Sequence, residues 1–113
     1  MRVDQDEVLA LFRTWREDRA LLRIELRLHL LAATFQVRVT RVESDQLSFM
    51  SDDKGSTLVV PLPPAADFRF LDLSRPPSTS ESFGRMLMLF YPFRKDLDES
   101  NQIVFAEQRE DRR

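Results

Sequence analysis

Arginine side chains at short, regular spacing are the most chemically suggestive feature of this sequence. Arg23 and Arg27 are four residues apart, His29 follows two residues later, and Arg38 lies further along the chain. A guanidinium group offers paired N–H donors that match carboxylate or phosphate oxygens. These four residues therefore predict a binding site for an anion or a phosphate-bearing ligand. The competing interpretation is that Glu25 neutralises the arginines on a solvated face, where exposed ion pairs contribute little.

The residue types needed for catalysis are scarce. The chain has no cysteine and one histidine, which excludes thiolate nucleophiles and metal sites built on paired histidines. Two glycines are too few for a glycine-rich phosphate loop, and no serine lies in a G-x-S-x-G turn. We therefore expect a non-catalytic protein with no catalytic residue, no bound metal and no cofactor.

The acidic segment 96–107 has the spacing of a calcium-binding loop. Its oxygen-bearing side chains at loop positions one, three, five and twelve are Asp96, Asp98, Ser100 and Glu107. The segment is similar to an EF-hand loop, although Asn101 replaces the glycine of the sharp turn and Pro92 interrupts the incoming helix. Because the flanking helices are missing, we favour a polar hairpin turn and leave calcium binding as the alternative.

Two short motifs resemble those of another family. The segment 23–27 reads R-x-x-x-R, and Asp72-Leu73-Ser74 reads D-x-S. Both fragments resemble the motifs with which PilZ domains bind cyclic dinucleotides, although Pro77 stands where that family has a glycine. The order of a helix followed by curved strands is also similar to Sm-like barrels. These resemblances imply a small β-barrel whose arginines, Arg23 and Arg27, hold a nucleotide phosphate.

Alternating apolar and polar residues predict the strands that carry these arginines. Apolar residues recur at every second position over 22–30 and again over 35–39, which is the period of strands with one buried face. A four-residue loop at 31–34 would place Arg27 opposite Arg38, and Leu30 opposite Phe35. The alternation breaks after Val39, which predicts a β-bulge at 40–41.

An amphipathic helix is predicted before the hairpin, over about 4–18. Asp4 can cap it, with Glu7 three residues later, and Val3 and Val8 are spaced as a hydrophobic staple. The apolar stripe of the helix is formed by Val8, Leu11, Phe12 and Trp15. We expect this stripe to lie on a β-sheet or to close one end of a barrel.

The rest of the chain is rich in short strands. They are predicted at 46–50, with Leu47 and Phe49 inward, at 57–60, around 68–70 as an edge strand, and at 103–105. Residues 86–91 are apolar at every position. Such a run predicts either a central strand covered on both faces or a surface that binds a second subunit.

Length and composition set the remaining expectations. A chain of 113 residues forms one domain, here 1–106, followed by a charged tail at 107–113 that we expect to fray. The net charge of −2 disfavours a general nucleic-acid binder. No apolar run is long enough to span a membrane and the N-terminus has no signal-peptide pattern, so a bacterial cytoplasm is expected.

The combined expectation is an α+β fold: an N-terminal helix on a small, curved, mostly antiparallel sheet or partly open β-barrel of six to seven strands. The expected function is a non-catalytic binding or interaction module that forms a homodimer. The alternative is a domain that binds an anion or a nucleotide through the arginines of the first hairpin.

Overall fold

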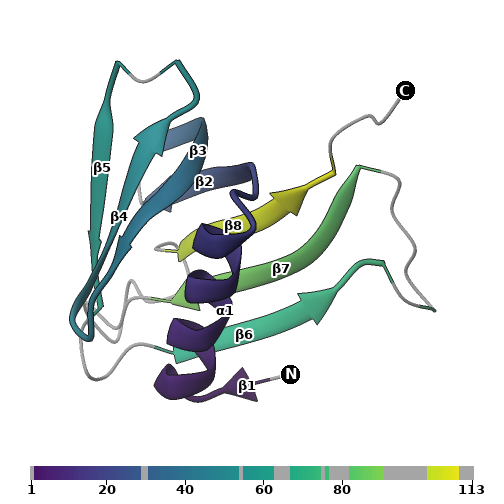
Figure 1. Ribbon diagram of the computed structural model, residues 1–113. Helices are drawn as coiled ribbons and strands as arrows, with labels where there is room; N and C mark the ends of the chain where they lie inside the picture. Colours follow the sequence, from purple (N-terminus) through teal and green to yellow (C-terminus); the bar gives the residue numbers. More distant parts are fainter. Residues whose placement is uncertain are drawn as a thin grey trace.

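The fold of the described residues is α+β, with one helix lying across one antiparallel sheet (Figure 1). The computed structural model describes residues 2–28, 31–53, 55–62, 67–74, 76, 82–90 and 102–109. The elements are β1 (Arg2–Val3), α1 (Gln5–Glu17), β2 (Leu22–Leu28), β3 (Leu31–Val42), β4 (Gln46–Ser51), β5 (Thr57–Pro61), β6 (Asp67–Asp72), β7 (Phe83–Phe90) and β8 (Gln102–Gln108). No helix among the described residues is both long enough and apolar enough to cross a bilayer.

The sheet is open. Its strand order is β1-β6-β7-β8-β2-β3-β4-β5, and every neighbouring pair is antiparallel. The sheet curves so strongly that β6 and β7 run across the view of Figure 1 while β4 and β5 run up it. Within the described residues β1 and β5 do not pair with each other, so the curved antiparallel sheet is confirmed and closure into a barrel is not.

Local sequence signals define both ends of α1. The side chain of Asp4 accepts a hydrogen bond of 2.9 Å from the backbone N–H of Glu7, which confirms the predicted cap. At the other end, Arg19 has a left-handed φ of 54°. The N–H groups of Arg19 and Ala20 donate to the carbonyls of Arg16 and Trp15, which is the pattern of a Schellman motif.

Four aromatic rings form the centre of the core, between α1 and the concave face of the sheet. Phe12 and Trp15 of the helix, Phe49 of β4 and Phe105 of β8 are all fully buried. The Phe12 ring meets the other three edge-on, with centroids 5.0 to 6.0 Å apart. The predicted apolar stripe of the helix therefore packs against the predicted inner face of the sheet.

The predicted register of the first hairpin is wrong. Leu28 pairs with Leu31, and Leu22 pairs with Val37. Residues 31–34, predicted as a loop, therefore belong to β3. The register differs from the predicted one by six residues, an even number that preserves which side chains face inward. Apolar alternation determines the face, but it does not determine where the chain turns.

Most other strand predictions are confirmed, but the strand predicted at the edge around 68–70 is β6, which lies between β1 and β7. The register shift between Val39 and Arg41 is the expected bulge, and Leu47 and Phe49 face the core. The apolar run at 86–91 contains most of β7, a central strand between β6 and β8. The boundary predicted at 106–107 falls inside β8, which continues to Gln108.

Candidate functional site

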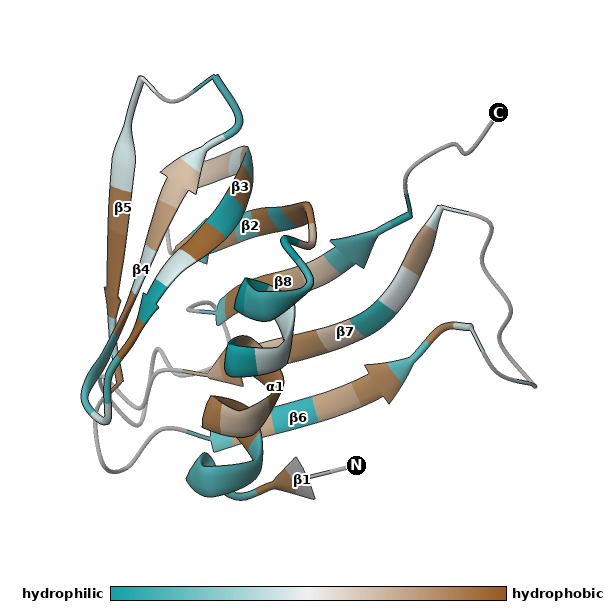
Figure 2. Ribbon diagram, in the orientation of Figure 1, coloured by the Kyte–Doolittle hydropathy of each residue, from teal (hydrophilic) through white to brown (hydrophobic). Residues whose placement is uncertain are grey.

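The best candidate site is an open groove of about 930 Å³ at the C-terminal end of α1. It is lined by residues 18–21, which follow the helix, and by the neighbouring ends of β6, β7 and β8. Figure 1 shows that these three strands extend beyond α1, toward the side on which β6 and β8 end and β7 begins. The end of β8 is correspondingly hydrophilic in Figure 2. The groove therefore lies over the part of the inner sheet face that the helix does not cover.

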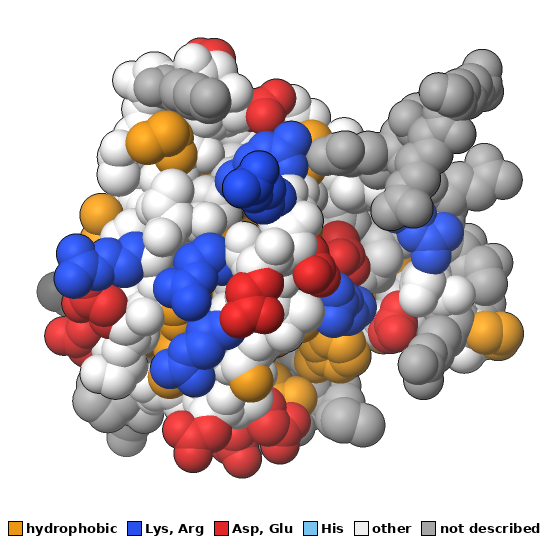
Figure 3. All heavy atoms as spheres, in the orientation of Figure 1, with side chains coloured by type: hydrophobic (Ala, Val, Ile, Leu, Met, Phe, Trp, Pro, Cys, Tyr) orange, Lys and Arg blue, Asp and Glu red, His pale blue; other side chains and the backbone are white. Residues whose placement is uncertain are grey.

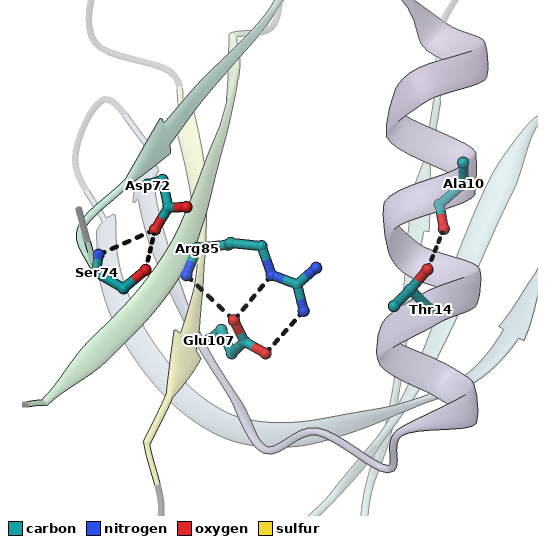
Figure 4. Close-up of polar contacts among 6 residues, drawn as sticks. All are labelled: Ala10, Thr14, Asp72, Ser74, Arg85 and Glu107. Atoms are coloured by element: carbon teal, nitrogen blue, oxygen red, sulfur yellow. Dashed lines mark hydrogen bonds and ion pairs between the residues drawn. The ribbon is translucent and has the colours of Figure 1, made fainter.

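A bidentate ion pair crosses the floor of this groove (Figure 4). Oε1 of Glu107 accepts from Nε of Arg85 at 3.0 Å and from its backbone N–H at 3.2 Å. Oε2 accepts from Nη2 at 3.0 Å. Arg85 comes from β7 and Glu107 from β8, so the pair joins two adjacent strands. Both side chains are about two-thirds or more buried, which makes this pair drier than a typical surface salt bridge.

Gly84 makes this arrangement sterically possible. A Cβ atom built at Gly84 would lie 2.7 Å from Oε1 of Glu107, closer than real Cβ contacts allow. Any larger residue would displace the carboxylate from the Arg85 backbone N–H. One of the two glycines in the chain therefore lies directly beneath the ion pair, where a close approach requires it.

The ion pair remains charged over a wide pH range. The hydrogen bonds from Arg85 lower the pKa of Glu107 below its ordinary value, although burial opposes this shift. The same interaction raises the pKa of Arg85, and the nearby carboxylates of Asp18 and Asp72 add to that increase. One arginine thus sits among three carboxylates, which favours its protonated form.

The single tryptophan of the chain lies under this site. The ring centroid of Trp15 is 5.9 Å from the Arg85 guanidinium carbon. Its indole N–H is buried and makes no hydrogen bond of ordinary geometry to any described residue, yet it is near enough to Glu107 to help keep that pKa low. Trp15 therefore couples the helix core to the ion pair, and its fluorescence should report events in the groove.

The rim of the groove is polar and electrically balanced. With the ion pair on the floor included, the lining holds the acidic residues Asp18, Asp72 and Glu107 and the basic residues Arg19, Arg85 and Arg109, so the formal charges of the described lining cancel. Ser74 donates through its N–H to Asp72 Oδ1 at 2.9 Å, which folds the D-x-S segment into a turn at the groove. Basic and acidic side chains are likewise interspersed over the described part of the face in Figure 3.

The arginines predicted as a binding cluster do not face each other as expected. Arg27 pairs with Ala32 of β3, whereas Arg38 pairs with Met50 of β4. His29 lies outside the described residues. The expected opposition of Arg27 and Arg38 is therefore wrong, because the hairpin register differs from the one inferred.

Carboxylates neutralise two of these arginines. Glu25 lies 3.1 Å from Nε of Arg27 on the same strand, and Asp52 lies 3.6 Å from Nε of Arg38. Arg23 is exposed on β2, with its guanidinium over an aromatic ring. Of the predicted positions, only Arg23 has a guanidinium group for which the described residues provide no carboxylate partner within 4 Å.

The calcium interpretation rests mainly on residues 96–101, which lie outside the described residues. Glu107, its twelfth position, is placed in β8, where it binds Arg85. Among the described residues, no group of three or more histidine, cysteine, aspartate or glutamate side chains could hold a metal ion.

The sequence analysis named Glu107 only as a calcium ligand and missed Arg85, although one signal of their ion pair was present. Ile103, Phe105 and Glu107 occupy alternate positions of a strand, so the carboxylate must share a face with two core residues. A charged side chain that falls on the buried face of a strand is typical of a buried ion pair or a binding site.

The chain was compared with protein-family models, curated protein sequences and solved structures, and none of these comparisons found a match.

Proposed function

We propose that this protein is a non-catalytic binding module whose groove takes a small ligand bearing both a cationic and an anionic group. The observation that carries the proposal is the partly buried Arg85–Glu107 pair at the floor of an electrically balanced groove. The lack of cysteine fits a reducing compartment such as a bacterial cytoplasm.

The anionic group of the ligand would meet the unused side of Arg85. Nε and Nη2 are occupied by Glu107, whereas Nη1 points away from that carboxylate in Figure 4. Nη1 makes no hydrogen bond within the described part of the chain, so its two N–H donors remain for a carboxylate or phosphate oxygen. Glu107 holds the guanidinium plane in place, which reduces the entropy lost on binding.

The cationic group would meet Asp18. This residue is the C-cap of α1 and lines the groove. Its carboxylate lies close enough to Arg85 to raise the pKa of that residue, so the two recognition groups are neighbours. The negative end of the helix dipole also points here and favours a bound cation.

Trp15 fluorescence tests this proposal directly. We would titrate the protein with amino acids and dipeptides, with inorganic phosphate as an anion-only probe and spermidine as a cation-only probe. We expect saturable changes with some zwitterionic probes, smaller effects with either control, and a loss of response in D18N. The matched control D6N, at the other end of α1, should behave as the wild type. No saturable response to any zwitterion, or full binding by D18N, would refute the proposal.

A phosphate-bearing ligand on the outer face of β2 is the second candidate. The observation that favours it is the exposed Arg23 guanidinium, 5.9 Å from the ring centroid of Phe83. A cation beside an aromatic ring could bind the phosphate and base of a nucleotide. A salt-sensitive rise in melting temperature with nucleotides, including cyclic dinucleotides, should then disappear in R23A. Unchanged melting temperatures would exclude this candidate.

A further inference from the structure

The strand β5 forms one edge of the sheet and leaves part of its backbone without a strand partner. Ser51 N–H donates to the carbonyl of Ser56 at 2.9 Å, and Leu62 N–H donates to that of Asp45 at 2.8 Å. Along two antiparallel strands, residue pairs whose backbones are hydrogen-bonded to each other alternate with pairs whose backbones are not. Even-numbered residues of β5 therefore bond to β4, whereas the N–H and C=O groups of Thr57 and Val59 point away from it. No described strand lies on that side.

The side chains of β5 itself are uncharged and mostly apolar. Val59 is 49% exposed and Met50, on the same outer face, is 37% exposed. The strand reads Thr-Leu-Val-Val-Pro, without any charged residue. Natural sheet edges are usually protected by charges, bulges or a covering segment. Within β5 the only such protection is Pro61 at the end of the strand, which limits how much of the edge can pair with another strand.

We propose that β5 pairs with β5 of a second copy of this chain, antiparallel and about a two-fold axis at Val59. In a symmetric pair of antiparallel strands, the residue at the two-fold axis pairs with its own copy. Its backbone N–H and C=O must both point toward the partner, and those of Val59 do so. Its N–H would donate to the carbonyl of the partner's Val59, and the reverse bond would form at the same time. The two exposed Val59 side chains would then lie together on one face.

Pairing of two copies at this edge is favoured over head-to-tail addition of many copies into a fibre. The opposite edge of the sheet is β1, which has only two residues and offers little backbone to pair with β5. Head-to-tail addition is therefore disfavoured, whereas the symmetric pairing closes after two chains. The absence of charge on β5 also means that two copies do not repel each other at the axis.

Sedimentation velocity over about 10 to 500 µM, the range in which weak dimers associate, tests the proposal. We expect the apparent mass to approach twice that of one chain at high concentration. V59K would place two like charges at the axis, and V59P would remove the outward N–H without breaking a bond to β4. Both variants should remain monomeric. The matched control L71K, at an exposed apolar residue of β6, should still dimerise.

A cysteine placed at the axis gives an independent readout, because the chain has no cysteine of its own. Bonded residue pairs in antiparallel strands have Cα atoms about 5.5 Å apart, within the range that disulfides span. V59C should therefore form a covalent dimer on mild oxidation at a rate at least ten times that of L71C. A wild type that stays monomeric at every concentration, or a dimer that survives both V59K and V59P, would overturn the proposal. A dimer lost in L71K alone would also overturn it and would place the interface on the outer sheet face.

Discussion

Replacing Gly84 by alanine should destabilise the protein through its effect on Glu107. The new Cβ would lie 2.7 Å from Oε1, and this oxygen accepts two of the three hydrogen bonds that hold the ion pair. The carboxylate is the end of a flexible side chain and can move away, so the steric clash itself is cheap. The cost is the loss of charged hydrogen bonds in a partly buried site, about 2 kcal/mol. At about 4 °C per kcal/mol for a chain of this size, the melting temperature should fall by about 8 °C.

The sign of the effect should reverse when Glu107 is absent. Gly84 does not have a positive φ, so alanine can adopt its backbone conformation without strain. In an E107A background there is no carboxylate to displace, and Gly84→Ala should then stabilise by about 0.5 kcal/mol by restricting the unfolded chain. Thermal and urea unfolding of the four proteins in this double-mutant cycle should give a coupling of about 2.5 kcal/mol.

The other glycine supplies the control. A Cβ at Gly55 would lie 3.3 Å from the exposed Asp53 side chain, so G55A should change stability far less than G84A. If G84A costs the same free energy in both backgrounds, the cost arises from the backbone and the steric role assigned to Gly84 is wrong.

Three further predictions concern the helix, the ion pair and the core. R19G should raise the unfolding free energy by about 1 kcal/mol, because glycine has no penalty in the left-handed conformation at φ 54°; thermal unfolding measures this. The lowered pKa of Glu107 means that its stabilisation is complete above the ordinary value of 4.5 and is lost as the pH falls through the lowered value. E107Q should flatten that acidic decline in the urea midpoint. F12A should cost about 3–5 kcal/mol, seen in the same urea titration, because it removes a fully buried ring that contacts three others.

Alternation in the sequence predicted the faces of the first hairpin but not its register. The pattern over β2 and β3 is invariant to a shift by an even number of residues, so it cannot locate the turn. The sequence predicts a loop at 31–34 because the segment between the two alternating stretches is short, yet Leu31, Ala33 and Phe35 continue the alternation into the strand. No glycine, proline, asparagine or aspartate near position 30 marks the turn. The expected opposition of Arg27 and Arg38 was wrong because it depended on that register.

The helix, in contrast to the hairpin register, was predictable because the sequence signals that define it are local. Asp4 caps the helix through a residue three positions away, and the apolar stripe repeats within a few turns. The candidate site, however, can be predicted only if the pairing of distant strands is known. Arg85 and Glu107 are 22 residues apart, and they meet only because β7 and β8 are neighbours in the sheet. Sequence patterns gave the two strands but not their pairing.

The position of the ion pair follows from how far the helix reaches across the sheet. Leu87 of β7 and Phe105 of β8 are fully buried beneath α1, whereas Arg85 and Glu107 lie on the same face one step beyond it. An apolar pair at these two positions would pack against Trp15 and would avoid the cost of removing two charges from water. The chain instead keeps a bidentate ion pair there, and places a glycine where any larger residue would disrupt it. Stability alone does not favour that choice, which is why we propose the groove, in preference to the arginines of the hairpin, as the site of binding.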